Sequence, residues 1–181
     1  MIKAIPDNFV KDCHLMVDEP VDKLQAYVDA GAGIVTCHVE STRHPHRVLQ
    51  SLAGTGVVRG IALNPGTPLE VVEPLIDDLE LLLLQAINPG WSGQKFIPGT
   101  ERRVAAAREL IGGRDVVLGV DGGVTKANIG QVASLRADLV VSGSAIFDGA
   151  SPADNLACMM EALRREKTPA VPARPSPSGQ V

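Results

Sequence analysis

Apolar residues gather along the chain in short continuous runs, each followed by a polar or Gly/Pro turn and a stretch with helical periodicity. A continuous apolar run is typical of a strand buried on both faces, whereas apolar residues three or four apart indicate a helix with one buried face. Strands are therefore predicted at residues 12–17, 34–39, 57–63, 79–87, 116–120 and 139–141. Helices are predicted at residues 20–30, 45–52, 100–111, 125–135 and 152–165, and another opens at residues 67–70.

Local signals mark three of these helix starts. Pro20 stands at a first-turn position, where its missing amide hydrogen is not needed. Thr67 and Glu70 have the spacing of a capping box. Thr125 is a candidate N-cap for the helix that follows residues 116–120.

Strand and helix alternate six times, which predicts an α/β fold with a parallel sheet and right-handed crossovers. Six units are compatible with an open doubly wound sheet or with part of a TIM (β/α)₈ barrel. The Gly-rich dinucleotide fingerprint is missing after the first predicted strand, which disfavours the open sheet. The last two loops contain Asp121-Gly122-Gly123 and Gly143-Ser144, and barrels often build a phosphate site after strands seven and eight. We therefore expect an incomplete TIM barrel of about six βα units that lacks strands one and two.

Asp121 is the first candidate for chemistry, because it ends a predicted buried strand and is followed by two glycines. The carboxyl ends of strands are where α/β folds place functional groups, and glycine lets backbone amides approach an anion closely. From this stretch alone, a plain βα turn in which Asp121 only caps the loop is equally well supported.

Composition narrows the class of protein. Hydrophobic residues make up 45% and charged residues 21%, and the net charge is −4 without a basic cluster. We therefore expect no nucleic-acid partner and no membrane partner, and we expect neither a signal peptide nor a membrane-spanning segment. Cys13, Cys37 and Cys158 form no paired or metal-binding spacing, and the first two lie in apolar runs. Buried reduced thiols in a cytoplasmic protein are the expectation.

Residues 1–166 are predicted to form one barrel domain. Residues 167–181 hold four prolines with Ala, Ser and Gly and have no apolar periodicity. This segment is predicted to be a disordered tail.

Five segments in register resemble the ribulose-phosphate 3-epimerase family over about residues 10–165. They are Cys13-His14-Leu15-Met16-Val17, Leu63-Asn64-Pro65, Asn88-Pro89-Gly90-Trp91-Ser92-Gly93-Gln94-Lys95-Phe96, Val120-Asp121-Gly122-Gly123 and Gly143-Ser144-Ala145-Ile146-Phe147. The resemblance implies a TIM barrel that binds one divalent metal ion, zinc, iron, manganese or cobalt, and a small-molecule sugar phosphate. It leaves a homo-oligomer open.

The resemblance also implies roles for individual residues. His14 and Asp121 match two of the family's four metal ligands, and Asp121 matches an acid that exchanges the proton at C3 of the sugar. Both are expected to contact the substrate. The remaining matches are Gly90, Trp91, Ser92 and Gly93 in a turn that closes over the substrate, Gly122, Gly123, Gly143 and Ser144 in a phosphate cradle, and Met16 near the reacting carbons.

The chain departs from the family pattern at three points. The other two metal ligands, a His and an Asp on strand two, have no counterpart, and that Asp is also the second acid. A strand-one serine is absent as well. We therefore expect either that the natural chain begins upstream or that this is a degenerate copy. Gln85 stands where the family usually has methionine, so substrate preference is expected to differ.

Other polar residues have competing interpretations. His38 and Glu40 resemble a His-x-Glu that the family places near the site, but their chemistry alone favours a structural role. His44, His46 and Lys95 are predicted to be exposed and not to bind metal or phosphate, and Cys37 is not predicted to be a nucleophile. Trp91 is interpreted as part of a lid rather than as loop packing.

Three functions follow. The first is epimerisation at C3 of D-ribulose 5-phosphate to D-xylulose 5-phosphate through an enediolate. The second is the same reaction on a related ketose phosphate such as allulose 6-phosphate. The third is a non-catalytic phosphate-binding remnant, because the second acid and two metal ligands are missing.

Overall fold

Within residues 2–91 and 93–167, which the computed structural model of the chain describes, six parallel strands form one sheet in sequence order. The strands are β1 (Asp12–Leu15), β2 (Ile34–His38), β3 (Val58–Leu63), β4 (Leu81–Gln85), β5 (Val117–Asp121) and β6 (Leu139–Val141). Each strand pairs in parallel with the next one along the chain. The parallel α/β sheet predicted from the apolar runs is confirmed.

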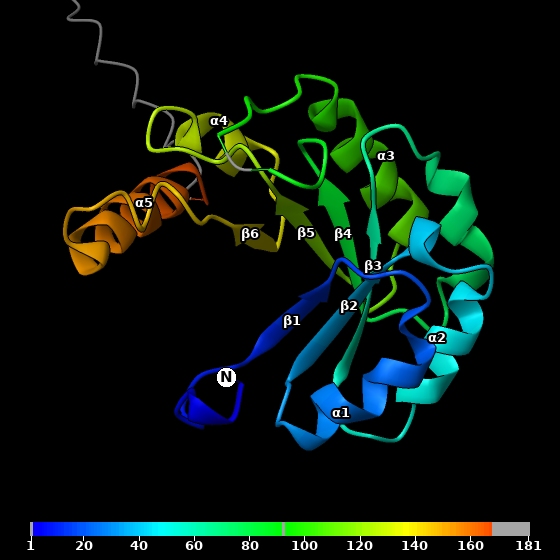
Figure 1. Cartoon of the computed structure of the whole chain (residues 1–181). Coiled ribbons are helices and arrows are strands. Elements are labelled where there is room, and N and C mark those ends of the chain that lie inside the picture. Colours follow the sequence, from blue (N-terminus) through cyan, green and yellow to red (C-terminus); the bar gives the residue numbers. More distant parts are fainter. Residues whose placement is uncertain (1, 92, 168–181) are drawn as a thin grey trace, which may run out of the picture.

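The connections contain α-helices and short 3₁₀ helices. The α-helices are α1 (Leu24–Asp29), α2 (Pro45–Leu52), α3 (Thr100–Ile111), α4 (Ile129–Ser134) and α5 (Pro152–Lys167), and the 3₁₀ helices are η1 (Ile2–Ala4), η2 (Pro20–Lys23), η3 (Val39–Ser41) and η4 (Leu69–Leu75). Figure 1 shows α1, α2 and α3 on the outer side of a curled sheet. It shows α4 and α5 near the end of the sheet that β6 forms. Within the described residues, no helix has the length and apolar character that crossing a bilayer requires.

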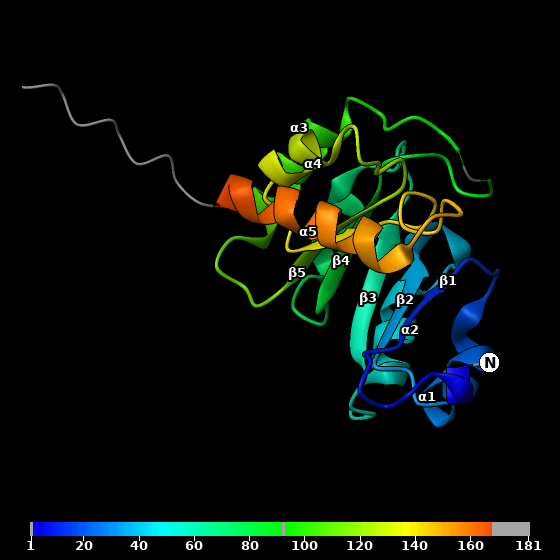
Figure 2. The ribbon, with the colours of Figure 1, turned by 90° about the vertical axis from the view of Figure 1, so that its left-hand side faces the viewer.

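The sheet curls but does not close. Its two end strands, β1 and β6, each have one neighbouring strand within the described residues, and they do not pair with each other. Figure 1 shows the resulting open arc, and in Figure 2, turned by 90°, α5 lies in front of the strands. The expectation of an incomplete (β/α) barrel is therefore confirmed.

The apolar runs explain why the sheet is the centre of the molecule. The four leucines of β4, Leu81–Leu84, are at most 1% exposed and are buried from both faces of the sheet. They belong to a strand covered on the outside by α3 and η4, where Val72, Val104 and Ala107 are also buried. Burial of a leucine side chain contributes about 1.5–3 kcal/mol, so β4 anchors the fold.

The capping box predicted at Thr67 and Glu70 is wrong. The segment is the 3₁₀ helix η4, which begins at Leu69 after Pro68 and has no side-chain cap. Pro74 lies inside it and lacks the amide hydrogen that an α-helix would need there. The Thr67 hydroxyl instead donates to Glu40, at the end of a different strand.

The N-cap predicted at Thr125 is also wrong for α4, which begins at Ile129. Thr125 instead closes a turn: its hydroxyl accepts from the Asn128 amide at 3.3 Å, and its own amide donates to Asn128 Oδ1 at 2.7 Å. Because these bonds complete a separate turn, the helix starts four residues later than predicted.

Other boundaries differ by a few residues. The first strand ends at Leu15 rather than at residue 17, and β4 is shorter at both ends than the predicted range 79–87. The segment predicted as one helix at 20–30 is η2 followed by α1. The last helix continues to Lys167, one residue into the predicted tail, and residues 168–181 lie outside the described residues.

Candidate active site

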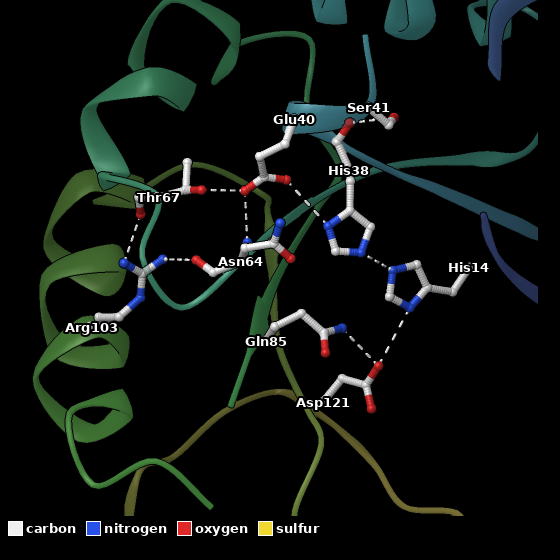
Figure 3. A network of polar contacts seen from close by, with 9 residues as sticks. All are labelled: His14, His38, Glu40, Ser41, Asn64, Thr67, Gln85, Arg103 and Asp121. Atoms are coloured by element: carbon white, nitrogen blue, oxygen red, sulfur yellow. Dashed lines mark hydrogen bonds and ion pairs between the residues drawn. The ribbon is translucent and has the colours of Figure 1, made fainter. Parts of the chain in front are cut away.

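Four polar side chains meet at the carboxyl ends of the strands. They are His14 on β1, His38 on β2, Gln85 on β4 and Asp121 on β5, and Figure 3 shows them pointing toward one another. Each strand delivers its residue to the same edge because all strands are parallel and paired in register. The side chains of His14 and Asp121 remain 17% and 18% exposed, so the cluster is accessible to a small molecule.

His14 joins the two halves of this cluster. Its Nδ1 lies 3.4 Å from Asp121 Oδ2, and its Nε2 lies 2.9 Å from Nε2 of His38. The two rings are nearly parallel, with 14° between their planes and 4.9 Å between centroids. Both ring nitrogens of His14 are therefore engaged by neighbouring side chains.

His38 contacts Glu40 as well as His14. The His38 side chain is 7% exposed, and its Nδ1 lies 3.2 Å from Glu40 Oε2. The other Glu40 oxygen accepts from the Asn64 amide at 2.8 Å and from the Thr67 hydroxyl. Burial raises the pKa of Glu40, but these hydrogen bonds outweigh it and bring the pKa to about 2. Glu40 is therefore ionised. It holds the loop that follows β3, which contains Asn64 and Thr67 and is called the β3 loop below, against the site.

Arg103 fixes the same loop from the other side. Its guanidinium donates from α3 to the carbonyl oxygens of Thr67 at 2.7 Å and Asn64 at 3.2 Å. Asn64 Oδ1 is buried without a hydrogen-bond partner. The Asn64 residue also lines a cavity of about 190 Å³, together with Met16 and His38. The loop is thus held rigidly while one polar atom stays free.

Asp121 is the carboxylate at the centre of the cluster. Burial raises its pKa, but hydrogen bonds from His14 and Gln85 outweigh that effect and hold the pKa below its ordinary value. The Gln85 amide donates to Asp121 Oδ2 at 2.9 Å. Asp121 is therefore ionised at neutral pH and able to accept a proton.

The two glycines after Asp121 have conformations that other residues rarely adopt. Gly122 and Gly123 have φ angles of 101° and 67°. A Cβ on Gly122 would lie 2.3 Å from Ile87 Cγ1, and one on Gly123 would lie 2.7 Å from the Phe96 backbone nitrogen. Only glycine lets this turn pack directly against the long loop after β4.

A cavity of about 250 Å³ lies beside Asp121, between the loops after β4, β5 and β6. Its lining includes Gly93, Asp121, Gly122, Gly123, Gly143 and Ser144. These residues, predicted for phosphate and substrate, are thus brought together. Gly90 and Trp91 do not line it, and Trp91 is 62% exposed. Ser92 lies outside the described residues.

The remaining predicted residues lie away from the cluster. His44, His46 and Lys95 are exposed, as expected. Cys37 is fully buried, and burial raises its pKa to about 12, which agrees with its exclusion as a nucleophile. Cys13 was expected to be buried, but it is partly exposed because it lies on the end strand β1. Sequence reasoning missed the contacts of Gln85 with Asp121 and of Glu40 with the β3 loop.

A metal ion does not fit the described residues as they stand. Catalytic metal sites usually have three protein ligands, and only His14 and Asp121 match ligands of the family pattern. No group of three or more His, Cys, Asp or Glu side chains within residues 2–91 and 93–167 is arranged to hold one. His14 would also have to give up a hydrogen-bond partner to bind a cation through either nitrogen.

Comparison with known proteins gives concordant matches. Residues 1–147 match the ribulose-phosphate 3 epimerase family. The chain is 40% identical over 139 residues to the ribulose-phosphate 3-epimerase of Bacillus subtilis (strain 168), covering 75% of this chain and 64% of that protein. It is 44% identical over 140 residues to that of Escherichia coli (strain K12), covering 76% and 62%.

The fold has solved relatives as well. The structure of 3-keto-L-gulonate-6-phosphate decarboxylase from Vibrio cholerae O1 biovar El Tor matches with a TM-score of 0.69 at 14% identity, covering 87% of this chain and 73% of that one. This likeness concerns the fold alone. The chain spans just under two thirds of the length of the curated relatives it matches.

Proposed function

The chain belongs to the ribulose-phosphate 3-epimerase family, and from this premise we propose that it binds a ketose phosphate and exchanges the proton at C3. The substrate that the family favours is D-ribulose 5-phosphate, whose epimer is D-xylulose 5-phosphate. The observation that carries the proposal is the position of Asp121, an ionised carboxylate at the wall of a cavity lined by glycines.

The glycine loops suit a phosphate group. Gly122 and Gly123 have positive φ angles and no side chains, so the backbone amides of this turn can be approached closely by an anion. Gly143 and Ser144 approach the same cavity from the loop after β6. A phosphate held there would place the sugar chain across Asp121, and binding energy from this remote group would orient the carbons that react.

Asp121 supplies the proton chemistry. The C3 hydrogen of a 2-ketose is acidic because the adjacent carbonyl accepts the electron pair as an enediolate. Asp121 takes this proton as a general base and returns a proton to the same carbon as a general acid. A single acid serves one face of the carbon, so inversion needs a second acid on the opposite face. No step is assigned to a metal ion, since the described residues offer two matched ligands.

The proposal is tested by proton exchange in D₂O. D-ribulose 5-phosphate and D-xylulose 5-phosphate are incubated separately with the chain, and loss of the C3 proton signal is followed by NMR. We expect exchange in the epimer whose proton faces Asp121, with little inversion. Asp121→Asn should reduce exchange at least about 100-fold, the usual contribution of a general base. Its affinity for inorganic phosphate should stay within about twofold.

Asp77→Asn is the matched control, because Asp77 is an exposed carboxylate paired with Arg114 away from the site. Phosphate binding without exchange in either epimer would favour the non-catalytic alternative, which the two-ligand site supports. If the chain neither binds phosphate nor exchanges the C3 proton, the proposal is overturned. Exchange of allulose 6-phosphate in preference to ribulose 5-phosphate would identify the related ketose phosphate, to which Gln85 points.

A further inference from the structure

We infer that Gln85 is a positioning residue that holds one oxygen of the Asp121 carboxylate and thereby assigns the proton transfer to the other oxygen. The inference deepens the proposed function and rests on it. It concerns Gln85, a residue that stands where the family usually has methionine.

The sheet register brings the two residues together. Gln85 and Asp121 are the last residues of β4 and β5, and they are directly paired across the two strands. Side chains of paired residues on neighbouring strands project on the same face and lie close enough to interact. The Gln85 amide uses this proximity and donates from Nε2 to Asp121 Oδ2 at 2.9 Å.

Burial makes the contact obligatory. Gln85 is 2% exposed and follows four leucines in β4. A buried amide without a partner is unfavourable, so a glutamine at the end of an otherwise apolar strand needs an acceptor. The acceptor here is Asp121, the one residue of the proposed mechanism that moves a proton.

The two oxygens of Asp121 are not equivalent. Oδ2 accepts from Gln85 Nε2 and also lies 3.4 Å from His14 Nδ1. Among the described residues, no side-chain or backbone donor engages Oδ1. Rotation of the carboxylate would break both Oδ2 contacts at once, so its orientation is fixed. Oδ1 is therefore the oxygen that exchanges the C3 proton. A methionine at position 85 would fill similar space but could not donate this bond.

The test compares Gln85→Met with Gln131→Met. Gln131 also donates from Nε2 to a carboxylate, that of Glu101 at 2.6 Å, but it does so on the surface between α4 and α3. Rates of C3 exchange are measured for both variants over a range of substrate concentrations. Gln85→Met should lower kcat for exchange about 10- to 100-fold, as expected for a misplaced catalytic group, with KM within about twofold. Gln131→Met should change neither.

Gln85→Leu provides a second variant of similar size that lacks the donor and adds no charge beside Asp121. It should also lose kcat rather than raise KM. Equal kcat in wild type, Gln85→Met and Gln131→Met would overturn the inference. So would a rise in KM alone, because the loss would then lie in substrate binding rather than in the orientation of Asp121.

A second measurement does not depend on activity. Unfolding in urea is measured for wild type, Gln85→Met, Asp121→Ala and the double variant. The two substitutions should be coupled by about fivefold or more in the folding equilibrium constant, because they remove the same hydrogen bond. Coupling below about twofold would overturn the inference. A wild-type chain with coupling but no exchange would overturn the proposed function and leave only the structural part of the inference, the contact of Gln85 with Asp121.

Discussion

The Nε2 atoms of His14 and His38 lie 2.9 Å apart, so one imidazole must donate to the other. The pair connects two carboxylates, Asp121 on one side and Glu40 on the other. The four side chains come from three different strand ends. Their contacts therefore depend on the relative positions of the carboxyl ends of β1, β2 and β5.

His38→Phe tests the contribution of this line to stability. Phenylalanine keeps an aromatic ring but removes the contacts to His14 and Glu40, leaving buried polar groups without partners. We expect a loss of about 1–3 kcal/mol in the free energy of unfolding, measured by urea denaturation. His46→Phe is the control: its pair with Asp78 is about half exposed, and its loss should cost less than about 1 kcal/mol. Equal losses in the two variants would contradict the prediction.

Glu40 should make stability depend on pH in the acid range. Its pKa in the folded chain is about 2, below its ordinary value of 4.5. Stability from Glu40 is therefore fully present above pH 4.5 and is lost as the pH falls toward 2. Urea unfolding between pH 7 and pH 3 should show a steeper loss for wild type than for Glu40→Gln. Glu73→Gln, at an exposed position on η4, should behave like wild type.

Gly123→Ala should disturb the glycine turn. The new Cβ would lie 2.7 Å from the Phe96 backbone nitrogen, and φ at this position is 67°. We expect a loss of about 1–3 kcal/mol in stability from backbone strain, together with weaker binding of inorganic phosphate measured by calorimetry.

Gly130→Ala is the matched control for this change. Gly130 lies in α4, and beyond its chain neighbours and the nearby backbone of that helix no described atom would lie within 4 Å of its Cβ. Alanine should therefore stabilise the chain by about 0.5–1 kcal/mol. Phosphate affinity that is equally unchanged in both variants would show that the turn at Gly123 is not part of the anion site.

The three thiols should react in a fixed order. Cys158 is exposed, whereas burial raises the pKa of both Cys13 and Cys37, the latter to about 12. Because the thiolate is the reactive form, iodoacetamide at pH 8 should label Cys158 first and leave Cys37 unmodified in the folded chain. Mass spectrometry of the peptides checks this order, and labelling in urea should modify all three. Early labelling of Cys37 would mean that β2 is not buried in solution.

Local patterns were sufficient for several elements. α2 and α3 have the bounds predicted from periodicity. Pro45 favours the start of α2 and Gly112 favours the end of α3, and both signals act on the adjacent helix residues. β4 is recognisable because a strand buried on both faces is apolar at every position, except where a polar side chain has a hydrogen-bond partner. The position of Asp121 at a strand end follows from the same reasoning.

Predictions about side-chain partners were less successful. Thr67 has the spacing of a capping residue, yet its hydroxyl donates to Glu40, 27 positions earlier in the chain. A local motif indicates which hydrogen bond a side chain can make with its neighbours in sequence. It does not indicate which stronger acceptor from a distant part of the sequence lies beside that side chain in the folded chain. An ionised carboxylate from another strand end is such an acceptor.

The amino-acid sequence by itself determined the class of fold, the place of Asp121 at the end of a buried strand and the two glycines after it, because each depends on neighbours along the chain. It did not determine that His38 and Glu40 join the cluster, since His14 and Asn64, their partners, are each 24 positions away. Nor did it show that Gln85 donates to Asp121, 36 positions later. These contacts were decided by the curl and register of the parallel sheet, which brings side chains at the ends of β1, β2, β4 and β5 into one connected cluster.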